Sequence, residues 1–188
     1  MKSKFNFKKL VSVLAALFLI FNVISCQRDE DVAADDLPQE ELTKITLNVK
    51  DIAAGTNKEY SYIIGSGAPV IPVTDGKSYE VTTTFWNGSD DVTKEIKDAK
   101  DEHFLIFDFP KSTVNLTRLD DKTSTGKLGK VGLKTKWDVV KAVGSSSPLL
   151  KLTLIHDPAS ANESQNGTAW GSVSGGETDA EATFGLTN

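Results

Sequence analysis

The chain contains two histidines, and each lies at the end of an apolar segment with strand-like alternation. His103 opens the segment 103–109, and His156 closes the segment 150–156. Each histidine shares its parity with the large apolar residues of its own segment. Since the start of one antiparallel strand lies beside the end of its neighbour, pairing of these two segments places the imidazoles close together.

Carboxylates stand next to both histidines: Glu102 precedes His103, and Asp157 follows His156. Imidazole and carboxylate groups together are suitable ligands for a transition metal, and two histidines can also hold a haem iron. These four residues are the candidate metal site of the sequence. A pair of histidines is by itself a weak metal signature, so two hydrogen-bonded histidines at the rim of the core are the simpler interpretation.

Other recognisable chemistry is missing from the sequence. There is no glycine-rich phosphate loop, no HExxH helix and no CxxC pair. Residues 65–67 read Gly-Ser-Gly, which does not have the spacing of a nucleophile elbow. No nucleophile and base can be paired, so the sequence predicts no catalytic residues and a protein that is not an enzyme.

Two tryptophans are candidate binding residues. Trp86 lies on the more polar face of its predicted strand, and Trp170 lies in a segment rich in Ser and Gly. Exposed aromatic side chains often anchor a partner. Packing in the core or in a loop is the alternative for each of them, because tryptophan is highly buried on average.

The elements that position these residues are predicted to be short β-strands. Alternating apolar and polar residues mark the segments 45–49, 58–64, 78–86, 103–109, 114–119, 131–140, 150–156 and 178–186. The one helical candidate is 90–100, where Asp90 or Asp91 is a suitable cap, and 159–176 is interpreted mainly as loop. With about seven to nine strands, residues 43–188 are expected to form an immunoglobulin-like all-β sandwich.

The N-terminal segment has the layout of a secretory signal. Four lysines precede an apolar run at 10–21, which is too short for a comfortable membrane span. Val23-Ile24-Ser25 then leads to Cys26, the one cysteine of the chain. These residues resemble a bacterial lipoprotein signal peptide, which implies that residues 1–25 are removed and that Cys26 carries the acyl chains that hold the protein to a membrane.

The residues after Cys26 are acidic. Removal of residues 1–25 from the 188-residue chain leaves 163 residues, with 17 basic against 26 acidic side chains and a net charge of −9. This charge argues against nucleic acid as a partner. Residues 26–42 have the composition of a flexible tether. Acids placed directly after the cysteine resemble the export signal of Bacteroidota lipoproteins, which favours the cell surface over the periplasmic face of the outer membrane.

A further resemblance covers much of the predicted domain. Its motifs are Asp-Glu-His-Phe at 101–104, Leu-Ile-His-Asp-Pro at 154–158 and the run from Gly175 to Phe184. They are similar to segments of small Bacteroidota lipoproteins that are often encoded beside a TonB-dependent outer-membrane receptor, some of which carry the label of the type 1 periplasmic binding fold. The chain lacks the alternating strands and helices of that fold.

Together these observations predict a non-enzymatic lipoprotein that binds a partner or ligand at the cell envelope. The resemblance implies an accessory role beside a TonB-dependent receptor in nutrient or metal uptake. Two alternatives stay open: a metal- or haem-binding lipoprotein that uses His103 and His156, and a structural or adhesive surface domain.

Overall fold

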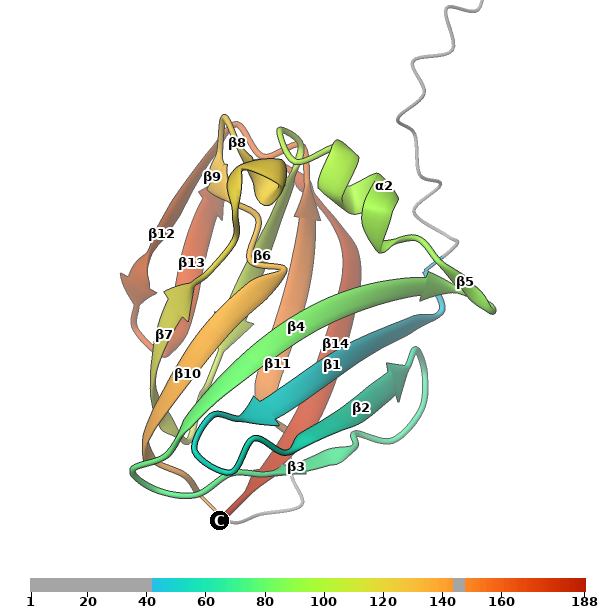
Figure 1. The fold of residues 1–188 in the computed structure, drawn as a ribbon. Coiled ribbons are helices and arrows are strands. Elements are labelled where there is room, and N and C mark those ends of the chain that lie inside the picture. Colours follow the sequence, from blue (N-terminus) through green and yellow to red (C-terminus); the bar gives the residue numbers. More distant parts are fainter. Residues whose placement is uncertain (1–41, 144–147) are drawn as a thin grey trace, which may run out of the picture. The chain divides into compact units, whose positions relative to one another are not determined.

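Residues 42–143 and 148–188 are described by the computed structural model, and they form two β-sheets that share one hydrophobic core (Figure 1). The predicted signal peptide, Cys26 and nearly all of the predicted tether lie outside the described residues. Within the described ranges, no helix is both long and apolar enough to cross a membrane.

The first sheet has the strand order β2-β1-β4-β10-β7, with the short β5 paired to β4. All its neighbouring strands are antiparallel. Its strands are β1 (Lys44–Asp51), β2 (Asn57–Ile63), β4 (Ser78–Asn87), β5 (Asp90–Asp91), β7 (Thr113–Arg118) and β10 (Lys134–Lys141).

The second sheet has the order β12-β13-β6-β11-β14-β3, in which only the pair of β14 and β3 is parallel. Its strands are β3 (Val70–Pro72), β6 (His103–Asp108), β11 (Pro148–His156), β12 (Ser160–Asn166), β13 (Ala169–Ser174) and β14 (Glu177–Thr187). The remaining elements are the helix α2 (Thr93–Asp98), the 3-10 turn η2 (Lys122–Ser124) and the small hairpin of β8 (Thr125–Gly126) and β9 (Gly129–Lys130).

Alternation along the strands explains how the two sheets pack. In β4 every second residue from Tyr79 to Phe85 is buried, while the residues between them are partly exposed. The core side chains of both sheets form one continuous cluster, with Trp137 fully buried and packed edge-to-face on Phe109. Each fully buried Leu, Phe or Ile contributes about 1.5–3 kcal/mol by leaving water, so this cluster is the main source of stability.

The prediction of an all-β sandwich is confirmed, and every predicted strand has a counterpart in the structure. The described residues contain 14 strands rather than seven to nine, because short pieces such as β3, β5, β8 and β9 carry too few residues to show alternation. The immunoglobulin-like type stays a prediction.

One segment was predicted wrongly. Residues 159–176 are not mainly loop: they contain the hairpin of β12 and β13, which extends the second sheet at its edge. Nearly all of β12 is exposed, so its sequence carries polar residues on both faces and lacks the alternation that reveals a strand. The turn between the strands is marked by Gly167, which has a positive φ.

The predicted helix is also shorter than expected. Helix α2 covers only Thr93–Asp98, and Asp90 and Asp91 belong to β5 instead. The Asp91 carboxylate still accepts a hydrogen bond from the Thr93 backbone N–H at 2.9 Å, at the beginning of the helix. The helix ends near Ala99, whose carbonyl takes part in the site described next.

Candidate metal centre

The two histidines lie side by side in the second sheet. Strands β6 and β11 pair antiparallel, and His103 and His156 are direct partners in their register. Their rings meet edge-to-face with centroids 4.9 Å apart. The His103 side chain is 1% exposed and that of His156 is 19% exposed. The two segments thus pair antiparallel, and this pairing brings the two imidazoles together.

A β-bulge adds a carboxylate that strict alternation does not place there. Leu154 pairs with Ala180 and Ile155 pairs with Thr178, so Asp179 is an extra residue between two ladder positions of β14. A bulge of this kind turns its extra side chain away from the direction that the pleat dictates. As a result the Asp179 carboxylate, only 6% exposed, lies beside both histidines.

One oxygen of Asp179 faces both imidazoles. Its Oδ2 lies 3.3 Å from His103 Nε2 and 3.4 Å from His156 Nδ1. Charge-assisted N–H···O bonds are shorter, about 2.7–2.9 Å. In the described part of the chain, His103 Nε2 and the other carboxylate oxygen, Asp179 Oδ1, are buried with no hydrogen-bond partner.

The contact of His103 with the Ala99 carbonyl determines which ring nitrogen carries the proton. His103 Nδ1 lies 3.0 Å from the Ala99 carbonyl, which only accepts hydrogen bonds, so Nδ1 carries a proton. In the neutral imidazole Nε2 then has a lone pair, and a carboxylate oxygen lies 3.3 Å from this nitrogen. Two acceptors held together in a buried place require a cation between them, either a proton or a metal ion.

The three side chains have the dimensions of a small metal site. One nitrogen from each histidine and one oxygen from Asp179 all lie within 4.8 Å of one another. Ligands placed tetrahedrally at about 2.1 Å from a zinc ion are about 3.4 Å apart, close to the two measured nitrogen–oxygen distances. The pattern of His103, with its second nitrogen bound to a carbonyl, is typical of metal-binding histidines.

The other two predicted ligands have different places. Glu102 Oε2 lies 3.8 Å from His156 Nε2, on the far side of that ring from Asp179. Asp157 is exposed in a turn with a positive φ of 44°, and its backbone N–H donates to the Glu102 carbonyl. The cluster therefore takes its carboxylate from Asp179 instead of Asp157, with Glu102 as a supporting group.

A glycine permits the close approach of β14 to His156. Gly176 has a φ of +84°, and a Cβ atom there would lie 2.6 Å from the His156 carbonyl oxygen. The turn before β14 thus needs glycine for its backbone conformation and for space. Gly176 was part of a motif in the sequence, but its contact with the histidine strand depends on the tertiary structure.

The two candidate tryptophans are both engaged within the domain. Trp86 is half-buried, with Lys44 Nζ 3.9 Å from its ring centroid and its indole N–H directed to Thr84 Oγ1. Trp170 is part of β13 rather than a loop, packs against the core and donates to the Val114 carbonyl at 2.8 Å. Neither tryptophan lies in the histidine cluster.

Asp179 is the member of the cluster that sequence reasoning missed. Alternation in 178–186 assigns it to the face opposite Thr178 and Ala180, and nothing in the sequence marks the bulge. Comparison of the chain with protein-family models, with curated proteins and with solved structures finds no match. A function has to be argued from the geometry of the domain and from the N-terminal sequence.

Proposed function

We propose that the protein is a cell-envelope lipoprotein whose β-sandwich binds a transition-metal ion through His103, His156 and Asp179. The observation that carries this proposal is the buried lone pair of His103 Nε2, which is fixed by the Ala99 carbonyl and faces an Asp179 oxygen. A metal ion placed between the two acceptors forms a coordination bond with each of them. His156 Nδ1, which lies 3.4 Å from the same oxygen, supplies the third ligand.

The ligand set indicates the class of metal. Two imidazoles and one carboxylate suit Zn²⁺, Cu²⁺ or Ni²⁺, whereas Ca²⁺ and Mg²⁺ prefer sites built from oxygen alone. Three protein ligands leave a coordination position free, and structural zinc sites use four. A site with a free position, next to a partly exposed histidine, suits an ion that is taken up and passed on.

The histidine geometry favours a bare ion over haem. The two rings are in contact and their strands are direct neighbours in the sheet. A porphyrin held by both histidines has to lie as a flat plate between them, and these rings leave no room for it. Haem binding by His103 and His156 therefore needs separation of β6 from β11, which costs backbone hydrogen bonds.

The N-terminal sequence supports the cellular setting of this proposal. Lipid on Cys26 anchors the protein to the outer membrane, and the acidic tether at 26–42 lets the domain extend away from the membrane. Tethering raises the effective concentration of the domain near a TonB-dependent receptor, so an ion is presented where uptake begins. The protein acts as a non-enzymatic accessory module in nutrient or metal uptake. A structural or adhesive role without any ion is the remaining candidate.

Titration of the purified full chain, in mild detergent, with Zn²⁺, Cu²⁺, Ni²⁺ and haem tests the metal site. We expect one ion per chain by calorimetry, and an affinity loss in Asp179→Asn beyond the roughly 10–100-fold that a supporting residue gives. The matched control is Asp157→Asn, the same change in an exposed residue next to His156. No binding, or equal binding by both variants and by His156→Ala, contradicts the proposal.

The partner is tested separately. We expect recovery of a TonB-dependent receptor with the tagged protein from membranes solubilised in mild detergent, and loss of that recovery in Cys26→Ala. Palmitate labelling of the wild-type chain and its absence in Cys26→Ala checks the lipid itself. Repeated recovery of the labelled protein without a receptor counts against the accessory role but leaves the metal site standing.

A further inference from the structure

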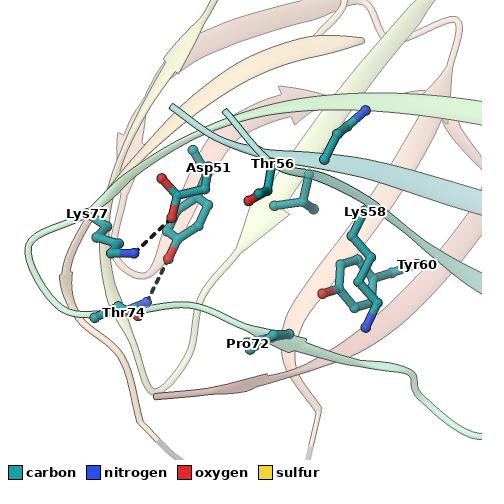
Figure 2. Close-up of a pocket in the computed structure, with 10 residues that line it drawn as sticks. Asp51, Thr56, Lys58, Tyr60, Pro72, Thr74 and Lys77 are labelled. Carbon is teal, nitrogen blue, oxygen red and sulfur yellow. Dashed lines mark hydrogen bonds and ion pairs between the residues drawn. The ribbon is translucent and has the colours of Figure 1, made fainter. Parts of the chain in front are cut away.

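A second candidate site lies at an open edge of the sandwich. A cleft of about 370 Å³ lies between β2, the last strand of the first sheet, and β3, the last strand of the second (Figure 2). Its volume is within the range of small-molecule sites. The cleft is independent of the histidine cluster, with which it shares no residue.

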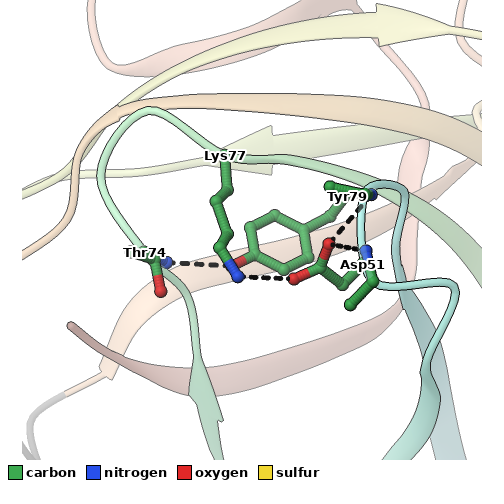
Figure 3. Close-up of polar contacts among 6 residues, drawn as sticks. Asp51, Thr74, Lys77 and Tyr79 are labelled. Atoms are coloured by element: carbon green, nitrogen blue, oxygen red, sulfur yellow. Dashed lines mark hydrogen bonds and ion pairs between the residues drawn. The ribbon is translucent and has the colours of Figure 1, made fainter.

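One end of the cleft is closed by its own contacts. Lys77 Nζ and Asp51 Oδ2 form an ion pair at 2.9 Å, and the Thr74 backbone N–H donates to the Tyr79 hydroxyl at 2.9 Å (Figure 3). The Asp51 carboxylate also accepts from the backbone N–H groups of Ala53 and Ala54. The negative charge of the cleft is therefore already compensated.

The other end of the cleft is open. Lys58 is the direct partner of Val49, whose side chain is buried on the inner face of the sheet, so Lys58 points to that same inner side. Its Nζ lies 5.2 Å from the ring centroid of Tyr60, and it forms no ion pair within 42–143 and 148–188. Lys58 is exposed at this open end, where a small anion can reach its ammonium group and form a charge-assisted hydrogen bond with it.

Tyr60 provides a second free group beside this charge. Its ring is buried, with 9% of the residue exposed, and burial raises the pKa of its hydroxyl. That hydroxyl has no hydrogen-bond partner among the described residues, and it points into the cleft (Figure 2). A neutral phenol at neutral pH is a hydrogen-bond donor, which complements the ammonium of Lys58.

We propose that this cleft binds a small hydroxylated carboxylate. The carboxylate lies between Lys58 Nζ and the Tyr60 hydroxyl. It accepts a charge-assisted hydrogen bond from the ammonium group and a second hydrogen bond from the neutral phenol. Apolar parts of the molecule lie against Val49, Pro72 and Tyr79, which line the cleft. The hydroxyl groups of Thr56 and Thr74, also in the lining, suit the hydroxyls of the ligand.

Glucuronate is the probe for this proposal, with glucose as its uncharged match. In NMR titrations of the full chain at low salt, we expect glucuronate to shift the amide signals of 56–60 and 74–79. Glucose is expected to bind about tenfold or more weakly, because it lacks the charge that Lys58 pairs with. Added salt lowers the affinity, as it does for partly exposed ion pairs.

Two variants assign the interaction to its residues. Lys58→Gln is expected to weaken glucuronate binding about tenfold, and Tyr60→Phe a few-fold, with unchanged spectra elsewhere. Lys50→Gln is the matched control, since Lys50 is an exposed lysine on the neighbouring strand β1 and on the opposite face from Val49. It is expected to bind as the wild type does.

The rival explanation is that Lys58 protects an edge strand from pairing with another chain. In that case Lys58→Gln forms oligomers in size-exclusion chromatography, while neither it nor the wild type responds to glucuronate. Absence of a wild-type response up to tens of millimolar, or equal binding by Lys58→Gln and Lys50→Gln, overturns the proposal. These outcomes are read without any metal present, so they do not depend on the histidine site.

Discussion

The buried Arg118 and the buried histidine cluster differ in how their hydrogen bonds are completed. Arg118, 4% exposed, donates through Nη1 to the carbonyls of Lys130 and Val131 and through Nη2 to that of Leu105. The nearby Asp120 accepts from two backbone N–H groups. The histidine cluster instead has acceptors that face one another.

Around Arg118 backbone carbonyls of the same chain accept from both Nη atoms, and the guanidinium also lies 4.2 Å above the Phe104 ring. Only Arg118 Nε has no hydrogen-bond partner in the described residues. Burial still has a cost, because loss of hydration lowers the pKa of Arg118 to about 10. Around Asp179 no hydrogen bond satisfies His103 Nε2 in the described residues, so a proton or the proposed metal ion has to lie between the two acceptors.

The largest effect is expected from removing Arg118. Arg118→Met removes the side-chain donors to the carbonyls of Leu105 and Lys130 and one of the two donors to that of Val131. It is expected to lower the free energy of unfolding by about 3 kcal/mol or more. Urea denaturation measures this loss. Lys122→Met, in an exposed residue nearby, is the control and is expected to stay within about 0.5 kcal/mol. Equal stability of the two variants contradicts a structural role for Arg118.

Glu102 tests whether the histidine cluster has a supporting group. Its contact with His156 Nε2 leaves Nδ1 free to bind an ion. Glu102→Gln is therefore expected to reduce Zn²⁺ affinity roughly 10–100-fold, less than Asp179→Asn does. Calorimetry with Glu95→Gln, an exposed residue of α2, as the control measures the difference. An unchanged affinity places Glu102 outside the site.

Asp179→Asn is expected to stabilise the metal-free protein, the opposite sign to Arg118→Met. The amide of the new side chain can donate to the lone pair of His103 Nε2, where the carboxylate only accepts. We expect a gain of about 1 kcal/mol in the free energy of unfolding in the presence of a chelator. Asp157→Asn is expected to change little. A destabilised Asp179→Asn would show that a proton already bridges His103 and Asp179.

The smallest effect is a pH dependence at Asp120. Burial raises the pKa of its carboxyl above the ordinary 3.8, against the opposing hydrogen bonds from Leu133 and Gly132. The folded state thus binds this proton more tightly than the unfolded state, so the contribution of Asp120 to stability grows as the pH falls through the raised pKa.

Comparison with Asp120→Asn isolates this contribution. The free energy of unfolding of the wild type, relative to that of the variant, is expected to rise as the pH is lowered from neutral to 3.8. Urea denaturation at several pH values measures this change. Zn²⁺ binding is expected to weaken over the same interval, since protons compete for metal ligands. A relative stability that falls as the pH is lowered contradicts the assignment to Asp120.

Much of the fold was predictable because alternation is a local property. The longer strands of both sheets, including β6 and β11, follow from apolar residues at every second position, whereas the meeting of His103 and His156 depends on the pairing of those two strands. Hairpin β12–β13 was not predicted because its edge strand β12 is exposed to solvent on both faces, and such a strand needs no apolar pattern.

The sequence by itself determined the all-β class and the place of each histidine at the end of an apolar strand. Only the tertiary structure decided which carboxylate joins the histidines, because the bulge at Asp179 is a mismatch in length between β11 and β14. Likewise, the open cleft at Lys58 and the carbonyl partners of Arg118 depend on how separate strands and turns come together. Local patterns fix the face on which a side chain lies, whereas its partners depend on the register between strands.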